Sequence, residues 1–143
     1  MLYPEDKLSK EDYQLLVEDL SSRLPYGVMI SPSDMHFYAE ELSIISLDGN
    51  EGEGVTQTKN GTPTYICNTM PYLRPMDSMT EEEKEYVEKY FTYTGYDDWD
   101  YVRFLNKKMF DYRGLIDKDL ALNVYDYSEN GDEIYSWLPK KKC

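Results

Sequence analysis

The sequence is poor in the residues on which most enzyme active sites and secreted scaffolds depend. It has one histidine, His36, and two cysteines, Cys67 and Cys143, in 143 residues. Two cysteines do not make a disulfide framework, so we expect a cytoplasmic chain with reduced thiols. His36 has no serine or cysteine partner at a recognisable spacing, and the chain has no Gly-rich phosphate loop. These absences predict a protein that is not an enzyme.

The chain also lacks a long apolar run and an excess of positive charge. No stretch approaches the roughly 18 apolar residues of a membrane helix, and the acidic start does not resemble a signal peptide. The formal net charge is −13. A negative surface repels both nucleic acid and anionic lipid. We therefore expect neither direct nucleic-acid binding nor a membrane partner.

Two acid-rich segments are candidates for metal sites, because Mg²⁺ and Ca²⁺ prefer oxygen ligands. The aspartates of residues 97–100 are better explained as the start of a helix, where carboxylates cap the backbone. Residues 48–59 open like a calcium loop, but Glu53 stands where such a loop needs glycine and Lys59 where it needs glutamate. We predict no metal and no cofactor.

Tyrosine is abundant, with 15 residues in an acidic chain. A tyrosine ring supplies a large contact area, and aromatic residues are enriched where proteins bind each other. An acidic, tyrosine-rich surface therefore predicts docking on a basic partner protein. An exposed edge strand or tyrosine patch would also favour a homodimer. The alternative is that the charge serves only solubility.

A first helix is predicted after Ser9, which can act as N-cap with Asp12 three residues on. Pro25 ends this helix, because proline disfavours helical dihedrals in the residue before it. The opposite face, which includes Asp19, is expected to point into water. The apolar face follows helical spacing and consists of Tyr13, Leu16, Val17, Leu20 and Leu24.

The middle of the chain, residues 26–73, predicts four or five short antiparallel strands that form a small sheet or half-open barrel. Two of them, Val55–Lys59 and Thr62–Cys67, flank Asn60-Gly61, the dipeptide favoured by a type I′ hairpin turn. Pro63 cannot donate a ladder hydrogen bond, so the second strand of this hairpin should lie at an edge or begin there.

The last third predicts two helices and then a C-terminal β-hairpin. Thr80 and Glu83 form a capping box at the start of the first of these helices. Its buried stripe is expected to contain Tyr86, Val87, Tyr90 and Phe91. The hairpin would pair Asn123–Tyr127 with Glu133–Trp137, ahead of a frayed basic tail at 138–143.

The predicted fold is thus a single α+β domain over residues 1–143. One hydrophobic core is expected to collect apolar side chains from the helices and the sheet. Its predicted members are Leu16, Val17, Leu20, Ile44, Val87, Phe91, Trp99, Val102 and Leu105.

Several segments resemble a family of small proteins from gut anaerobic bacteria and their phages. The blocks are Arg23–Val28, Met70–Glu83 (with the run YLRPMDSMTEEE), Phe104–Lys107 and Phe110–Ile116 (FDYRGLI). The resemblance implies a phage or mobile-element setting, and it brings no catalytic residues. It favours a phage-borne inhibitor that docks on a host protein, a component of host defence.

The four arginines support an alternative, because three of them lie in these blocks. A guanidinium fork can pair with phosphate while a tyrosine ring stacks on a base. The protein could then sequester a nucleotide second messenger. Equally, the arginines could pair with carboxylates and tie helices to the sheet. A small enzyme is a third alternative. The candidate ligand-binding residues are Arg23, Arg74, Arg103, Arg113, Tyr72 and Tyr112.

Overall fold

The computed structural model describes residues 9–31, 39–47, 54–91, 98–127, 134, 135, 137 and 138, with the side chains of 98, 99 and 127 left out. A helix comes first, followed by strands, two further helices, and a short strand and helix. This order confirms the α+β class. His36, Cys143 and residues 48–53, the first half of the calcium-like segment that was rejected as a metal site, lie outside the described residues.

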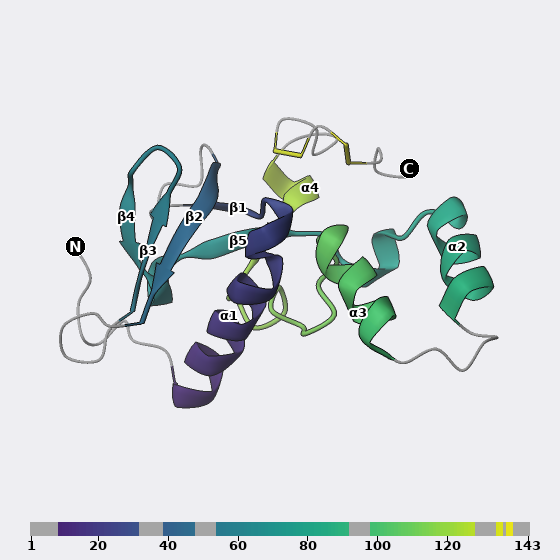
Figure 1. The fold of residues 1–143 in the computed structure, drawn as a ribbon, viewed down its shortest axis with the longest axis horizontal. Helices are drawn as coiled ribbons and strands as arrows, with labels where there is room; N and C mark the ends of the chain where they lie inside the picture. Colours follow the sequence, from purple (N-terminus) through teal and green to yellow (C-terminus); the bar gives the residue numbers. More distant parts are fainter. Residues whose placement is uncertain are drawn as a thin grey trace.

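In the described part of the chain, six strands form one open sheet in the order β4-β3-β2-β1-β5-β6 (Figure 1). Neighbouring strands pair antiparallel except β5 and β6, which are parallel. The sheet is therefore mixed and is not closed into a barrel. The strands are β1 Met29–Ser31, β2 Glu40–Ser46, β3 Val55–Thr58, β4 Pro63–Tyr65, β5 Met70–Leu73 and β6 Leu122–Asn123.

The helices are α1 Lys10–Arg23, α2 Glu81–Phe91, α3 Asp98–Lys107 and α4 Val124–Tyr127. As predicted, the Ser9 hydroxyl accepts the backbone N–H of Asp12 at 3.1 Å and begins α1. Pro25 lies in the 3₁₀ turn that follows α1, and Gly27 ends that turn at φ +78°. In the described part of the chain, no helix is both long and apolar enough to cross a membrane.

The β3–β4 hairpin is present, and Pro63 begins its edge strand as predicted. Its turn differs from the expected type I′, because only Gly61, at φ +89°, is left-handed. The Thr58 N–H donates to the Thr62 carbonyl at 3.1 Å and closes a three-residue loop. A left-handed glycine at the last loop position is typical of such loops. The second strand also ends at Tyr65, so the prediction that it reaches Cys67 was wrong.

The C-terminal hairpin was wrong over its first half, because Val124–Tyr127 is helical. The Asn123 side-chain oxygen accepts the N–H of Tyr125 at 3.0 Å. This side-chain hydrogen bond stabilises a backbone turn, which competes with the hydrogen bonds of a strand ladder. The predicted tail also starts too early, because Leu138 is buried in the core.

The buried apolar residues that the structure describes form two clusters and not the single predicted core. The larger cluster joins α1 to the sheet and contains Leu16 and Leu20, with Val17 at its margin. The smaller one contains Leu105, with Val87 at its margin. Ile44 is 51% exposed, so its placement in the core was wrong. The side chain of Trp99 lies outside the described residues.

Gly54 gives a test of the packing between α1 and the sheet. A Cβ at this position would overlap the side chains of Ile66 and Tyr13. We expect Gly54→Ala to lower the free energy of unfolding by about 1–3 kcal/mol, the usual cost of overpacking. Chemical denaturation measures this change. Adding Ile66→Val removes one overlapping methyl group, so the double variant should recover part of the lost stability. If the stability changes of the two single variants simply add in the double variant, the overlap at Gly54 is contradicted.

Candidate functional site

Arg74, the residue after β5, is fully buried and belongs to an ion pair with Glu83 of α2. Its Nη1 and Nη2 donate to Glu83 Oε2 and Oε1 at 2.9 and 2.8 Å. The guanidinium also lies 4.0 Å from the centre of the Phe110 ring. A bidentate ion pair and a cation–π contact are among the strongest interactions that a guanidinium makes in proteins. It fixes the first turn of α2 to the end of β5.

Glu83 completes the predicted capping box as well. Its Oε1 accepts the Thr80 N–H at 2.9 Å, and its own N–H donates to the Thr80 hydroxyl at 3.1 Å. Burial acts to raise the pKa of Glu83, but the bonds from Arg74 and Thr80 outweigh it and hold the pKa below its ordinary value. The carboxylate therefore stays ionised where α2 begins.

Asp19 of α1 is fully buried between two arginines, although its position predicted exposure to water. Its Oδ2 lies 2.9 Å from Arg23 Nε and its Oδ1 lies 2.7 Å from Arg113 Nη1. The Tyr112 ring lies 5.5 Å from Arg23 and 4.5 Å from Arg113. The segment after Phe110 covers this face of α1. Helical periodicity in the sequence cannot predict that a distant segment packs there.

The segments that carry the family resemblance meet around Phe110. The Arg74 N–H donates to the Met109 carbonyl, and the Asp111 N–H donates to the Arg74 carbonyl, both at 2.8 Å. Arg23 Nη2 donates to the Phe110 carbonyl at 2.6 Å. These arginines therefore tie α1, β5 and the 109–113 segment together, as the structural alternative predicted.

The six candidate residues consequently do not converge on one ligand site. Tyr72 is buried and its carbonyl accepts the Tyr135 hydroxyl at 2.9 Å. Tyr112 donates its hydroxyl to Asn106 Oδ1 at 2.9 Å. A phosphate on Arg74 would have to break the bidentate pair with Glu83. Arg103 differs from the other arginines, because its side chain is 55% exposed on α3.

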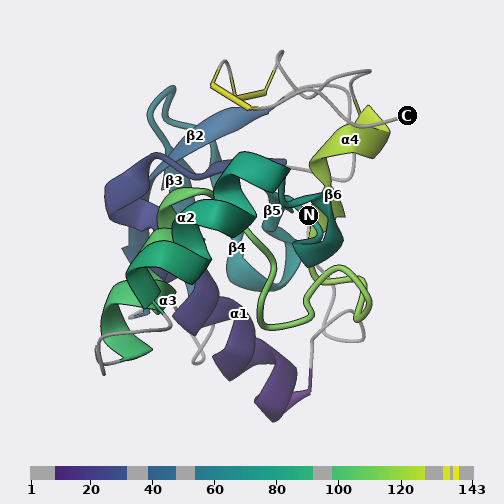
Figure 2. The ribbon, with the colours of Figure 1, turned by 90° about the vertical axis from the view of Figure 1, so that its right-hand side faces the viewer.

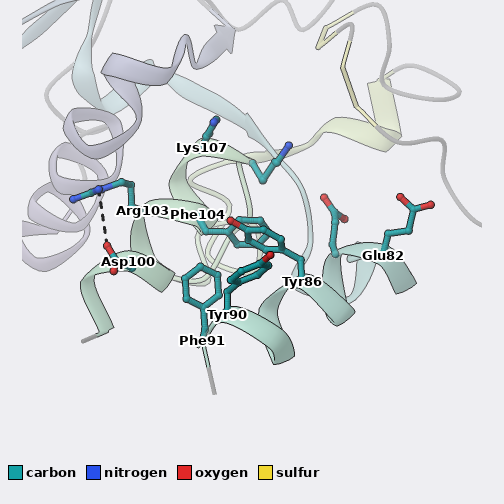
Figure 3. A pocket seen from close by; sticks show the side chains of 10 residues that line it. Glu82, Tyr86, Tyr90, Phe91, Asp100, Arg103, Phe104 and Lys107 are labelled. Atoms are coloured by element: carbon teal, nitrogen blue, oxygen red, sulfur yellow. Dashed lines mark ion pairs between the residues drawn. The ribbon is translucent and has the colours of Figure 1, made fainter. Parts of the chain in front are cut away.

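A cleft of about 720 Å³ separates α2 from α3 (Figure 3). Tyr86 and Tyr90 are 45% and 51% exposed at this cleft, so their predicted burial was wrong. The reason is that α2 packs mainly against α3 (Figures 1 and 2), which leaves the rest of the stripe uncovered. The lining residues are Glu82, Glu83, Tyr86, Tyr90, Phe91, Asp100, Arg103, Phe104, Lys107 and Lys108.

Aromatic rings form a continuous row from this cleft into the protein. The Tyr86 ring lies 4.8 Å from Tyr90 and stacks on Phe104 at 5.2 Å. Phe104 in turn lies 6.3 Å from Phe110, the ring beneath Arg74. Such ring pairs stabilise the fold by more than the burial of their apolar area alone provides. The exposed tyrosines are thus held by the same residues that anchor α2.

The two walls of the cleft differ in charge. Glu82 and Glu83 come from α2, whereas the α3 side carries Arg103 and Lys107, the following Lys108, and one acid, Asp100 (Figure 3). Sequence reasoning missed this cleft as a site. The sequence did contain a signal for the exposure of Tyr86 and Tyr90. They lie four residues apart on a helix rich in glutamate, and a helix that is polar nearly all round is seldom buried.

A second pocket of about 320 Å³ lies between the C-terminal end of α1 and α3. None of its lining residues is acidic, although the chain is strongly acidic overall. Two of the predicted site residues, Arg103 and Arg113, line this pocket together. The lining residues are Ser21, Ser22, Pro25, Tyr26, Val102, Arg103, Asn106 and Arg113.

Within the described residues, no group of three or more histidine, cysteine, aspartate or glutamate side chains is arranged to hold a metal ion. Comparisons of the chain with protein-family models, with curated proteins and with solved structures give no match.

Glu83→Ala tests the buried pair with Arg74. Removing one partner of a buried ion pair leaves an uncompensated charge, so we expect a loss of about 3–5 kcal/mol in the free energy of unfolding. The neighbouring Glu82 is exposed and serves as the control. Glu82→Ala should change stability by no more than about 0.5 kcal/mol. Equal effects of the two variants in chemical denaturation would contradict the assigned role.

The same pair predicts a pH dependence. The pKa of Glu83 is lowered from its ordinary value of 4.5, so its stabilising contribution is present above pH 4.5 and is lost as pH falls through the lowered pKa. The stability difference between the wild type and Glu83→Gln should therefore shrink on acidification. Denaturation curves from neutral to acidic pH measure it, and a difference that grows would refute the assignment.

Proposed function

We propose that the protein is a non-enzymatic binding protein that docks on another protein through α2. The observation that carries this proposal is the exposure of eight of the eleven α2 residues. The exposed residues of α2, here called the α2 face, are Glu81, Glu82, Lys84, Glu85, Tyr86, Glu88, Lys89 and Tyr90.

The two tyrosines give the α2 face its contact area. Their ring centres are 4.8 Å apart and each ring is about half exposed. Isolated exposed apolar residues are ordinary, but adjacent exposed rings form a patch, and tyrosine is among the residues that most often dominate binding energy. The pair of Arg74 with Glu83 holds α2 in place. A preorganised helix loses less conformational entropy on binding.

The charge of the α2 face indicates the chemistry of the partner. Four exposed glutamates outnumber the two exposed lysines, Lys84 and Lys89. The net charge of −13 adds a long-range field of the same sign. Both features favour a basic partner surface. That the partner is a host defence component, encountered in a phage setting, is the further proposal that the family resemblance suggests.

A double substitution, Tyr86→Ser with Tyr90→Ser, tests the docking surface. It removes both rings while leaving the glutamates in place, so a captured basic partner should bind at least about tenfold more weakly. The control is Tyr65→Ser, because Tyr65 is 40% exposed on β4 at the other end of the molecule (Figure 1). Equal loss in both variants, measured by surface plasmon resonance, would refute the proposal.

Salt provides a second test of the same surface. The screening length falls from about 10 Å at 0.1 M to about 3 Å at 1 M ionic strength. If the acidic α2 face steers the encounter, the association rate should fall markedly over this range. Replacing Glu81, Glu82, Glu85 and Glu88 by glutamine should flatten that dependence. An association rate that does not change with ionic strength would count against electrostatic steering by the α2 face.

A further inference from the structure

We propose that the pocket between α1 and α3 binds a small phosphate-bearing molecule through Arg103 and Arg113. This site is distinct from the α2 face and does not depend on the proposed docking function. It rests on the arrangement of charge around α1, on the position of Arg103, and on the size of the pocket.

The charge around Asp19, at the C-terminal end of α1, is unbalanced toward positive. Asp19 is shared by Arg23 and Arg113, so two guanidinium groups face one carboxylate. Arg23 Nη1 is buried and has no hydrogen-bond partner in the structure. Arg113 and Arg103 bring two positive charges to the pocket, whose lining has no acidic residue. An anion bound there would offset this local excess of positive charge. The excess contrasts with the net charge of −13 of the whole chain.

The two arginines approach the pocket from different elements. Arg113 follows the Phe110 segment, and its contacts with Asp19 and Ser22 use only two of the five N–H donors of a guanidinium. Arg103 projects from α3 toward α1, away from the aromatic rings of the cleft (Figure 3). Its contact with Asp100 is 3.9 Å long and exposed on both sides. Exposed pairs of this kind contribute little, so a phosphate can compete with Asp100.

The dimensions and the remaining lining define the ligand class. A volume of about 320 Å³ lies at the small end of the range for ligand pockets, which suits a phosphomonoester or a mononucleotide better than a larger ligand. Guanidinium forks match the geometry of phosphate oxygens. Ser21 and Asn106 add neutral polar groups, and Tyr26 offers the side of a ring.

Titration calorimetry with inorganic phosphate, ribose 5-phosphate and a mononucleotide tests the proposal at constant ionic strength. We expect saturable binding of at least one of these probes at millimolar concentration or below. Phosphate alone would define a site for the phosphate group, whereas tighter binding of the mononucleotide would place its base beside Tyr26. Absence of binding by all three probes would overturn the proposal.

Arg103→Gln should weaken the binding about tenfold or more, since it removes a charge-assisted hydrogen bond. The matched control is Lys107→Gln, which removes one positive charge from the same helix but from the cleft and not from the pocket. This control should leave the affinity nearly unchanged. If both variants lose affinity equally, the effect is general electrostatics and the assigned site is wrong. Arg103 is exposed, so its replacement should leave the fold intact, which circular dichroism can verify.

Discussion

Burying a guanidinium is unfavourable unless carboxylates, carbonyls and ring faces surround it, and this requirement organises the protein around Phe110. The Phe110 ring supports Arg74, and the Phe110 carbonyl accepts a hydrogen bond from Arg23. Glu83 and Asp19 supply the carboxylates. Through these contacts α1, β5 and α2 are each fixed to one short segment. The position of α2 therefore depends on polar contacts more than on a large apolar core.

This arrangement bears on the proposed function, because it leaves the outer face of α2 exposed to solvent. A helix held by its first turn and by a narrow apolar strip does not need its outer face for stability. Tyr86 and Tyr90 can therefore stay exposed beside the glutamates. The pocket between α1 and α3 belongs to the same arrangement, since Arg113 lines it while pairing with Asp19 of α1. Arg113 thus contributes to stability and also lines the proposed phosphate site.

The structure also changes the relation between the two binding hypotheses. A nucleotide site on Arg74 and Tyr72 would require breaking the pair with Glu83 and exposing a buried ring. Arg103 and Arg113 avoid this cost, because one is exposed and the other keeps unused donors at a pocket. The proposed docking face and the proposed phosphate pocket are therefore centred on different helices, although Arg103 lines both the pocket and the cleft beside Tyr86 and Tyr90. Neither one requires the other.

Caps and turn residues in the sequence account for part of the local structure. Ser9, Thr80, Pro63 and Gly61 act on neighbouring backbone through caps and turns, so the helix starts and the β3–β4 hairpin could be predicted. Tertiary structure alone decided the rest, because helical periodicity cannot show which neighbours cover a face. Asp19 is buried since a segment more than ninety residues away brings Arg113 to it. Tyr86 and Tyr90 are exposed since, among the described helices and strands, α3 packs most closely on α2, which leaves part of its apolar stripe open to solvent.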